Sequence, residues 1–402
     1  MTGDVLMIKP DHIMKIETLS QEYEDLIKDW RRHLHEYPEL SFKEFNTSSF
    51  IVDKLEEIGC QVTKEVAGTG VIGLLDTKRP GRVIAFRADM DALPVSEEAN
   101  EPFSSKNPGV MHACGHDAHM AIMLGLAKVL SECLDEMCGA VKFIFQPGEE
   151  ANGGARLMID AGALENPHVE VIYALHMIPE IAAGMVGVRE GYMTATDDEV
   201  TIRVFGSSAH SSAPNEGVNA ITAAAHMITT MQTVITESLS PHDVAVFSIC
   251  TINGGDALNV IPDYAEMTGM LRCVEKSKKR LLAERLKQVC EGVAQAFGGK
   301  VEVDIKEGFP AVNNDRMYTK ILTKCAEEVI DPAVIIMIQN PHMGSEDFSY
   351  YQEVIPGVMF MLGSKPSDGN GGSLHSPDLR ICEDSLLIGV RIFAALALRL
   401  CG

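Results

Sequence analysis

Several apolar runs in the sequence are followed within a few residues by side chains of the kinds that bind metals or carry protons, and this limits the possible folds. The side chains are four carboxylates and a histidine: Asp89 and Asp91 after residues 83–86, Glu149 and Glu150 after 141–145, and His176 after 169–175. Each run is typical of a buried strand, and open α/β sheets gather their ligands at the carboxyl ends of parallel strands. A helical pattern at 118–133 separates two of the runs, which favours crossover helices. The sequence therefore predicts a mostly parallel α/β sheet with one convergent site.

The segment HACGHDAH, residues 112–119, places three histidines and Cys114 within eight residues. Its spacing matches none of the structural zinc patterns, so the segment alone leaves two interpretations open. It is either a metal site or a polar loop that caps the following helix. The flanking carboxylates favour a metal. One of the adjacent Glu149 and Glu150 can turn to a metal while the other acts as a general base beside it.

The pattern of elements changes near residue 198. Six segments follow in the order strand, helix, strand, strand, helix, strand: 199–205, 219–236, 245–252, 265–273, 277–297 and 300–305. This order is typical of a small antiparallel sheet with two helices on one face. We therefore predict an inserted, ferredoxin-like α+β domain at 198–307, within a catalytic domain formed by 1–197 and 308–402.

Composition excludes several classes of partner. A formal net charge of -23 argues against nucleic acid and anionic membranes, which select basic surfaces. The first residues lack the pattern of a signal peptide, and the longest apolar stretch, 385–398, is interrupted by Arg391 and too short to span a bilayer. Ten cysteines without a signal peptide are most simply reduced thiols. We therefore expect a cytoplasmic protein without a nucleic-acid or membrane partner.

A set of motifs occurs in order along nearly the whole chain: RRHLHEYPELSF (31–42), FRADMDALPV (86–95), MHACGHDAHMA (111–121), FIFQPGEE (143–150), ALHM (174–177), NVIPDYAEMTGMLR (259–272), GSEDFSYY (344–351) and LHSP (374–377). Together they resemble the amidohydrolase branch of the aminoacylase and carboxypeptidase-G metallopeptidase family. That branch includes hippurate hydrolases and indole-acetyl-amino-acid hydrolases. The combination is specific, although no single motif would be.

The resemblance implies a metal-dependent hydrolase that splits N-acyl or N-acetyl amino acids into a carboxylic acid and a free amino acid. It implies two divalent metals, with zinc or manganese favoured over cobalt or nickel, held by Cys114, His116, Glu150, His176 and His375. Glu149 would be the general base that activates the bridging water. Asp91 would orient ligands without touching a metal.

In the inserted domain, the resemblance implies that His210 is a lid histidine that reaches the scissile carbonyl. It would act in its own chain or from the partner of a homodimer formed through this domain. Arg272 would bind the substrate carboxylate, with Asn259 near it. The chain has GSSAH at 206–210 and HDAHM at 116–120, where the family commonly has Gly-Lys-Gly-Gly-His and His-Asp-Gly-His-Thr. These departures affect the expected substrate preference, not the expected ligands or base.

The residues also bear on several other functions. Residues 68–73 spell a dinucleotide-binding glycine pattern, but residues 71–76 continue as a strand where that pattern needs a helix. A non-catalytic metal or amino-acid binding protein on the same fold would have little need of Glu149. A dipeptidase is a third alternative, and a serine hydrolase lacks its Gly-x-Ser-x-Gly motif. The sequence leaves the acyl group, the amino acid and the metal open.

Overall fold

The computed structural model describes residues 7–151 and 153–402, which divide into two compact units. The first unit comprises Met1–Met193, Val312–Asn340 and Asp347–Gly402, and the second comprises Thr194–Ala311 and Pro341–Glu346. The predicted insertion at 198–307 lies within the second unit, but the sequence pattern did not assign 341–346 to it. Residues 1–6, on which part of the localisation prediction rests, lie outside the described residues.

The described residues of the first unit form an eight-stranded sheet with the order β1-β2-β4-β3-β5-β16-β6-β15. Its strands are β1 (Gln61–Val66), β2 (Gly70–Asp76), β3 (Val83–Asp89), β4 (Ala140–Gln146), β5 (Val171–Ala182), β6 (Val186–Val188), β15 (Ile335–Met337) and β16 (Gly357–Lys365). The central strands β4, β3, β5 and β16 run parallel, whereas β2 is antiparallel to β4 and β6 to β16. This mostly parallel sheet confirms the predicted fold class.

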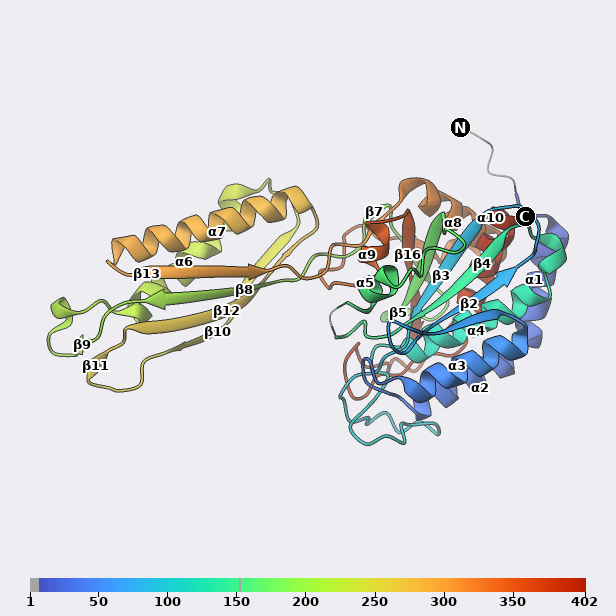
Figure 1. The fold of residues 1–402 in the computed structure, drawn as a ribbon, viewed down its shortest axis with the longest axis horizontal. Coiled ribbons are helices and arrows are strands. Elements are labelled where there is room, and N and C mark those ends of the chain that lie inside the picture. The colour runs from blue at the N-terminus through green and yellow to red at the C-terminus, as the bar shows by residue number, and fades with distance from the viewer. Residues whose placement is uncertain (1–6, 152) are drawn as a thin grey trace. The chain divides into compact units, whose positions relative to one another are not determined.

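Helices cover both faces of this sheet (Figure 1). One face packs against α1 (Pro10–Glu22), α2 (Glu24–Glu36), α3 (Phe45–Ile58), α4 (His116–Ser131), α8 (Arg316–Val329) and α10 (Ser385–Cys401). The other packs against two short helices, α5 (Gly154–Asp160) and α9 (Ser349–Gln352). Successive residues of β3 alternate between the two cores, with Phe86 in the first and Ala85 in the second. The central strands are therefore apolar on both faces, as the sequence runs predicted.

The second unit has the β-α-β-β-α-β order expected from the sequence. Its sheet order is β10-β12-β8-β13, all antiparallel, and both helices lie on one face (Figure 1). The elements are β8 (Asp198–Phe205), α6 (Ala220–Ser238), β10 (Ala245–Gly254), β12 (Tyr264–Cys273), α7 (Lys276–Ala296) and β13 (Lys300–Lys306). A short pair, β9 (Ala209–His210) and β11 (Val260–Ile261), extends from it. Asn219 caps α6 by accepting a hydrogen bond from the Thr222 amide.

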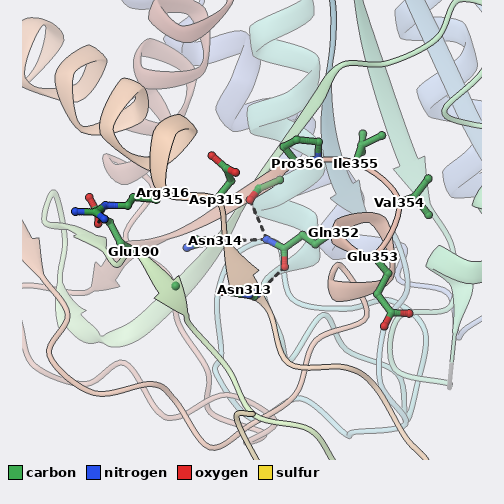
Figure 2. Close-up of a pocket in the computed structure, with 12 residues that line it drawn as sticks. Glu190, Asn313, Asn314, Asp315, Arg316, Gln352, Glu353, Val354, Ile355 and Pro356 are labelled. Atoms are coloured by element: carbon green, nitrogen blue, oxygen red, sulfur yellow. Dashed lines mark hydrogen bonds and ion pairs between the residues drawn. The ribbon is translucent and has the colours of Figure 1, made fainter. Parts of the chain in front are cut away.

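A second short strand pair joins the two segments that connect the units. The chain leaves the first unit after one of these segments and returns to it at the other. β7 (Gly191–Tyr192) pairs with β14 (Asn313–Asn314). The side chain of Asn314 binds Met359 in β16: its Nδ2 donates to the Met359 carbonyl, and its Oδ1 accepts from the Met359 main-chain amide. Figure 2 shows Asn313 and Asn314 beside Gln352, which accepts a hydrogen bond from the Asn313 main-chain amide, in the wall of a pocket of about 740 Å³. The re-entry point is therefore fixed to the sheet of the first unit.

Two predictions of local structure are tested by strands of the first unit. The prediction that a strand ends just before His176 is wrong, because β5 continues to Ala182, where it still pairs with Lys365 of β16. Residues 70–76 form strand β2 with no helix after the glycines, which excludes the dinucleotide-binding pattern.

Within residues 7–151 and 153–402, no helix is both long and apolar enough to cross a membrane.

Aromatic packing between α10 and the sheet yields a stability prediction. Phe393 is 1% exposed, and its ring lies 4.7 Å from that of Phe86 and 5.5 Å from that of Phe360, between ring centroids. Phe393→Ala should therefore cost about 3–5 kcal/mol of unfolding free energy. Denaturant unfolding followed by fluorescence measures this in the first unit, because Trp30 in α2 is the only tryptophan of the chain.

Met14→Ala is the control, since Met14 is 64% exposed and should change the free energy by less than about 0.5 kcal/mol. Equal effects of the two substitutions would contradict the packing described.

Candidate metal centre

Four separate parts of the first unit contribute side chains to one site. Cys114 and His116 stand on either side of Gly115, whose φ of +85° lets the chain turn sharply into α4. Glu149 and Glu150 occupy the turn after β4. His176 lies in β5, just past Ala174, which is the last residue of β5 that pairs with β3. The fourth part is the loop before α10, which carries His375. All four parts lie at the carboxyl edge of the parallel strands β3 and β4.

The loop histidine is held in an uncommon backbone conformation. His375 has φ +65°, and its amide donates to the Ala113 carbonyl at 2.7 Å. A positive φ in a residue other than glycine is costly and persists where surrounding contacts enforce it. The contact with Ala113 places His375 beside the Cys114 segment.

The ligand-type atoms of these residues fall into three overlapping groups, each with all atoms within 4.8 Å of one another: Cys114, His116 and His176; Cys114, Glu150 and His375; and His116, Glu149 and Glu150. The Cys114 Sγ and His176 Nε2 atoms are 3.5 Å apart, and His375 Nε2 lies 3.2 Å from a Glu150 oxygen. Because the groups share Cys114, His116 and Glu150, they describe one centre. Such a mixture of thiol, imidazole and carboxylate suits divalent zinc or a similar metal.

Main-chain hydrogen bonds orient His116, which is buried, and His176, which is half-buried. His116 Nδ1 donates to the Asp91 carbonyl and His176 Nδ1 to the Met177 carbonyl, each at 2.8 Å. This leaves each Nε2 directed into the centre, which is how ligand histidines are usually held. Burial lowers the pKa of His176 to about 3, so this imidazole is neutral and has a lone pair to offer.

The charges and the unpaired nitrogen around His116 suit a cation. Burial alone would lower the pKa of His116, but the neighbouring Asp89 carboxylate and Cys114 raise it well above the usual range. His116 Nε2 is nevertheless buried without a hydrogen-bond partner among the described residues, since an Asp89 oxygen lies 3.6 Å away. Burial raises the pKa of the Cys114 thiol. An orphaned nitrogen among negative groups fits a bound cation, so the residues present suit the implied metals.

Asp91 supports the turn that carries the two glutamates. Its Oδ1 accepts from the Glu149 amide at 3.1 Å, and its Oδ2 accepts from the Glu150 amide at 3.0 Å and from the Ser41 hydroxyl at 2.6 Å. Burial would raise the pKa of Asp91, but the His116 side chain and these donors lower it below the usual range. Asp91 therefore stays ionised and binds the main chain of the turn.

A second carboxylate, that of Asp89, binds His119, a histidine that is not among the predicted site residues. Asp89 accepts from His119 Nδ1 at 2.6 Å, and His119 Nε2 accepts from the Met177 amide at 2.9 Å. Both nitrogens of His119 are thus engaged, so this histidine links β3 to β5 and is not a ligand in this arrangement. The position of His119 one helical turn after His116 in α4 was the available signal.

Asp89 is itself held by a buried arginine. Arg87 donates to Asp89 at 2.7 Å, to Gln146 at 2.9 Å and to Asp347 at 2.7 Å. Burial would raise the pKa of Asp89, but His116, His119 and Arg87 hold it well below the usual range. The ends of β3 and β4 are therefore tied by charged hydrogen bonds directly beneath the centre.

The predicted substrate-contacting residues belong to the second unit. His210 is exposed, and its Nδ1 accepts from the Ser212 amide at 3.1 Å, which leaves the proton of a neutral ring on Nε2. Asn259 is exposed, and its carbonyl accepts from the Ser211 amide at 3.0 Å. Arg272, on β12, donates to the Met343 carbonyl at 2.9 Å. Their approach to the metal centre stays a prediction.

The α/β fold, together with a thiol, imidazole and carboxylate donor set at its strand ends, defines a metallohydrolase class of protein. Residues 85–399 match the peptidase family M20/M25/M40, and the chain belongs to this family. The resemblance found in the sequence is thereby confirmed, and the chain is a metal-dependent amidohydrolase.

Individual relatives match over most of their length. An N-acetylcysteine deacetylase of Bacillus subtilis is 38% identical, covering 91% of this chain and 94% of the relative. The IAA-amino acid hydrolase ILR1-like 4 of Arabidopsis thaliana is 36% identical, covering 92% and 86%. Among solved structures, the YXEP protein of Bacillus subtilis, a dinuclear metal-binding peptidase from the M20 family, is similar with a TM-score of 0.84, 35% identity and coverage of 94% and 98%.

Removal of the thiol provides a spectroscopic test of the centre. Cobalt bound through Cys114 should give a near-ultraviolet thiolate-to-metal charge-transfer band, which Cys114→Ser should abolish because a hydroxyl is not an equivalent soft ligand. Absorption spectra of the cobalt-loaded proteins measure the band. Cys250→Ser is the control, since Cys250 is exposed and lies in the second unit. A band that survives in Cys114→Ser would contradict the ligand assignment.

Proposed function

We propose that this protein hydrolyses the amide bond of N-acyl amino acids to a carboxylic acid and a free amino acid. The observation that carries the proposal is the pair of adjacent glutamates on one turn, with both main-chain amides bound by Asp91. Adjacent residues held this way can divide two tasks between them, metal binding and proton transfer. The names of the deacetylase and the IAA-amino acid hydrolase support the substrate class.

In this proposal two divalent metals are held by five ligands: Cys114, His116, Glu150, His176 and His375. When bound, the metals would supply Lewis acidity that activates water and polarises the amide carbonyl. The cysteine favours zinc on grounds of softness, and the carboxylate also accepts manganese, cobalt or nickel.

Glu149 is the proposed general base. Its residue is 8% exposed, and one of its carboxylate oxygens lies within 4.8 Å of ligand atoms of His116 and Glu150. It would accept a proton from the attacking water and deliver that proton to the nitrogen of the leaving amino acid. Asp91 contributes by fixing the main chain of Glu149 and not by transferring a proton itself.

Residues of the second unit complete the proposal. His210, with its proton on Nε2, would donate a hydrogen bond to the carbonyl oxygen as negative charge develops there, either in its own chain or from a partner. Arg272 would bind the carboxylate of the amino-acid half, with Asn259 beside it. An arginine that fixes this carboxylate positions the scissile bond and selects amino-acid conjugates.

Glu149→Gln should lower kcat by about 100- to 10,000-fold while the metal content stays unchanged, because the amide cannot accept the proton. Amine release from N-acetyl, N-benzoyl and indole-acetyl amino acids and from dipeptides measures turnover, and elemental analysis measures the metals. Glu180→Gln is the control, since Glu180 is exposed. Undiminished turnover in Glu149→Gln would refute the role of the base.

The same panel separates the proposed function from its alternatives. Acyl amines without a carboxylate should be poor substrates if Arg272 selects that group. Dipeptides cleaved faster than all acyl amino acids would indicate a dipeptidase. Calorimetric binding of acyl amino acids by the metal-loaded protein, without any amine release, would indicate a binding protein.

We further propose a homodimer formed through the second unit. β10 is an edge strand of its sheet, and Val246 and Ile252 on it are 41% and 48% exposed. An edge strand offers unpaired main-chain groups that a second copy can bind. Light scattering should give twice the mass of one chain, and Ile252→Lys on this edge should return the mass to that of one chain. A single-chain mass for the unsubstituted protein would contradict the dimer.

A further inference from the structure

Three successive amides of the turn after β4 donate hydrogen bonds to buried carboxylates. The Glu149 and Glu150 amides donate to Asp91, as described above. The preceding amide, of Gly148, donates to Glu44 Oε1 at 3.1 Å. Successive N–H groups that converge on an anion form a concave, well-ordered structure. Here the protein supplies the anions from two different segments, and Glu44 has no role in the proposed chemistry.

The Glu44 side chain does not cap α3, the helix that begins next to it. It occupies the N-cap position of α3, but its side chain makes no capping hydrogen bond. Glu39 caps the start of α3 instead: its carboxylate accepts hydrogen bonds from the Thr47 amide at 2.9 Å and from the Asn46 side chain at 2.7 Å. The Glu44 carboxylate instead turns inward, where it also accepts from the Thr69 hydroxyl at 2.6 Å.

The surroundings of Glu44 are unusual for a carboxylate. The residue is 0% exposed, and within residues 7–151 and 153–402 no Lys, Arg or His lies at ion-pair distance from it. Burial raises its pKa above the usual range. A buried polar group of this kind is tolerated only where donors satisfy it. The donors are the Thr69 hydroxyl and main-chain amides, so the function of Glu44 is hydrogen-bond acceptance.

Neighbours of Glu44 contact the same turn. Phe42 has φ +60°, and its ring packs on Gly148 so closely that a Cβ on this glycine would lie 2.3 Å from the ring. The Ser41 hydroxyl donates to Asp91. Residues 41–44 therefore hold the turn from one side through a hydroxyl, a ring and a carboxylate, with Gly148 required for close approach.

We propose that Glu44 is a positioning residue: by binding the Gly148 amide it sets the direction in which the Glu149 and Glu150 side chains leave β4. Loss of the acceptor leaves a buried N–H without a partner and frees the turn to rotate. The role of Glu149 rests on the proposed function, whereas the effect on Glu150 can be measured through metal binding alone.

The test compares Glu44→Met, which removes the acceptor at similar volume, with Glu44→Gln. The glutamine retains an amide oxygen for Gly148, and the Thr69 hydroxyl can turn to accept from its nitrogen. Cobalt titration of the metal-free full-length protein, read by absorption, should show affinity about 10- to 100-fold weaker in Glu44→Met and largely restored in Glu44→Gln. Where the wild type turns over substrate, kcat should fall with KM little changed.

Glu39→Met is the matched control, because it removes the cap of α3 without touching the turn. It should leave the cobalt affinity unchanged even if it lowers stability. Wild-type cobalt affinity in Glu44→Met, or an equal loss in Glu39→Met, would overturn the proposal. Cobalt binding requires no substrate, so it still tests Glu44 if no acyl amino acid is hydrolysed.

Should Glu44→Met not fold, as judged by Trp30 fluorescence, Glu44→Asp takes its place. The aspartate keeps the charge but withdraws the carboxylate by one methylene. The proposal predicts weaker cobalt binding in Glu44→Asp than in Glu44→Gln, and equal binding would overturn it.

Discussion

Asp91 accepts main-chain hydrogen bonds from both Glu149 and Glu150, and the rest of the site depends on this contact. It fixes a turn that carries a proposed ligand and the proposed base, whose side chains must point to different places. The same residue presents its carbonyl to His116 Nδ1, which turns Nε2 toward the centre. One residue at the end of a buried strand thus orients groups from β4 and α4 together.

The cost of this arrangement is a large amount of buried charge. Asp89, Asp91 and Arg87 are each at most 2% exposed. Charges removed from water are tolerated when hydrogen bonds and opposite charges satisfy them, and removal of one partner leaves the others uncompensated. The ends of β3 and β4 and the first turn of α4 supply these partners: Arg87 bonds Asp89 and Gln146, and His119 of α4 donates to Asp89. The parallel sheet is therefore what allows so polar a site to be built inside a protein.

Much of the architecture could be predicted from the sequence because it depends on local patterns. The strands expected at 199–205 and 300–305 match β8 and β13 to within one residue at each end, and the helix expected at 277–297 matches α7 equally well. The ligand-type residues could be named because motifs and strand ends place them together. The roles of His119 and Glu44 could not be predicted, since each depends on a hydrogen bond to a distant main-chain amide. The assignment of 341–346 to the second unit depends likewise on long-range contacts such as that of Arg272 with Met343.

The central proposal is that one site of the first unit binds two cations through ligands from four parts of the chain. Anomalous diffraction from crystals of the metal-loaded protein, collected at the absorption edge of the metal, tests it most directly. The account predicts two anomalous peaks per chain, each about 2.0–2.3 Å from its ligand atoms. These atoms belong to Cys114, His116, Glu150, His176 and His375. Peaks elsewhere, or none within this donor set, would contradict it.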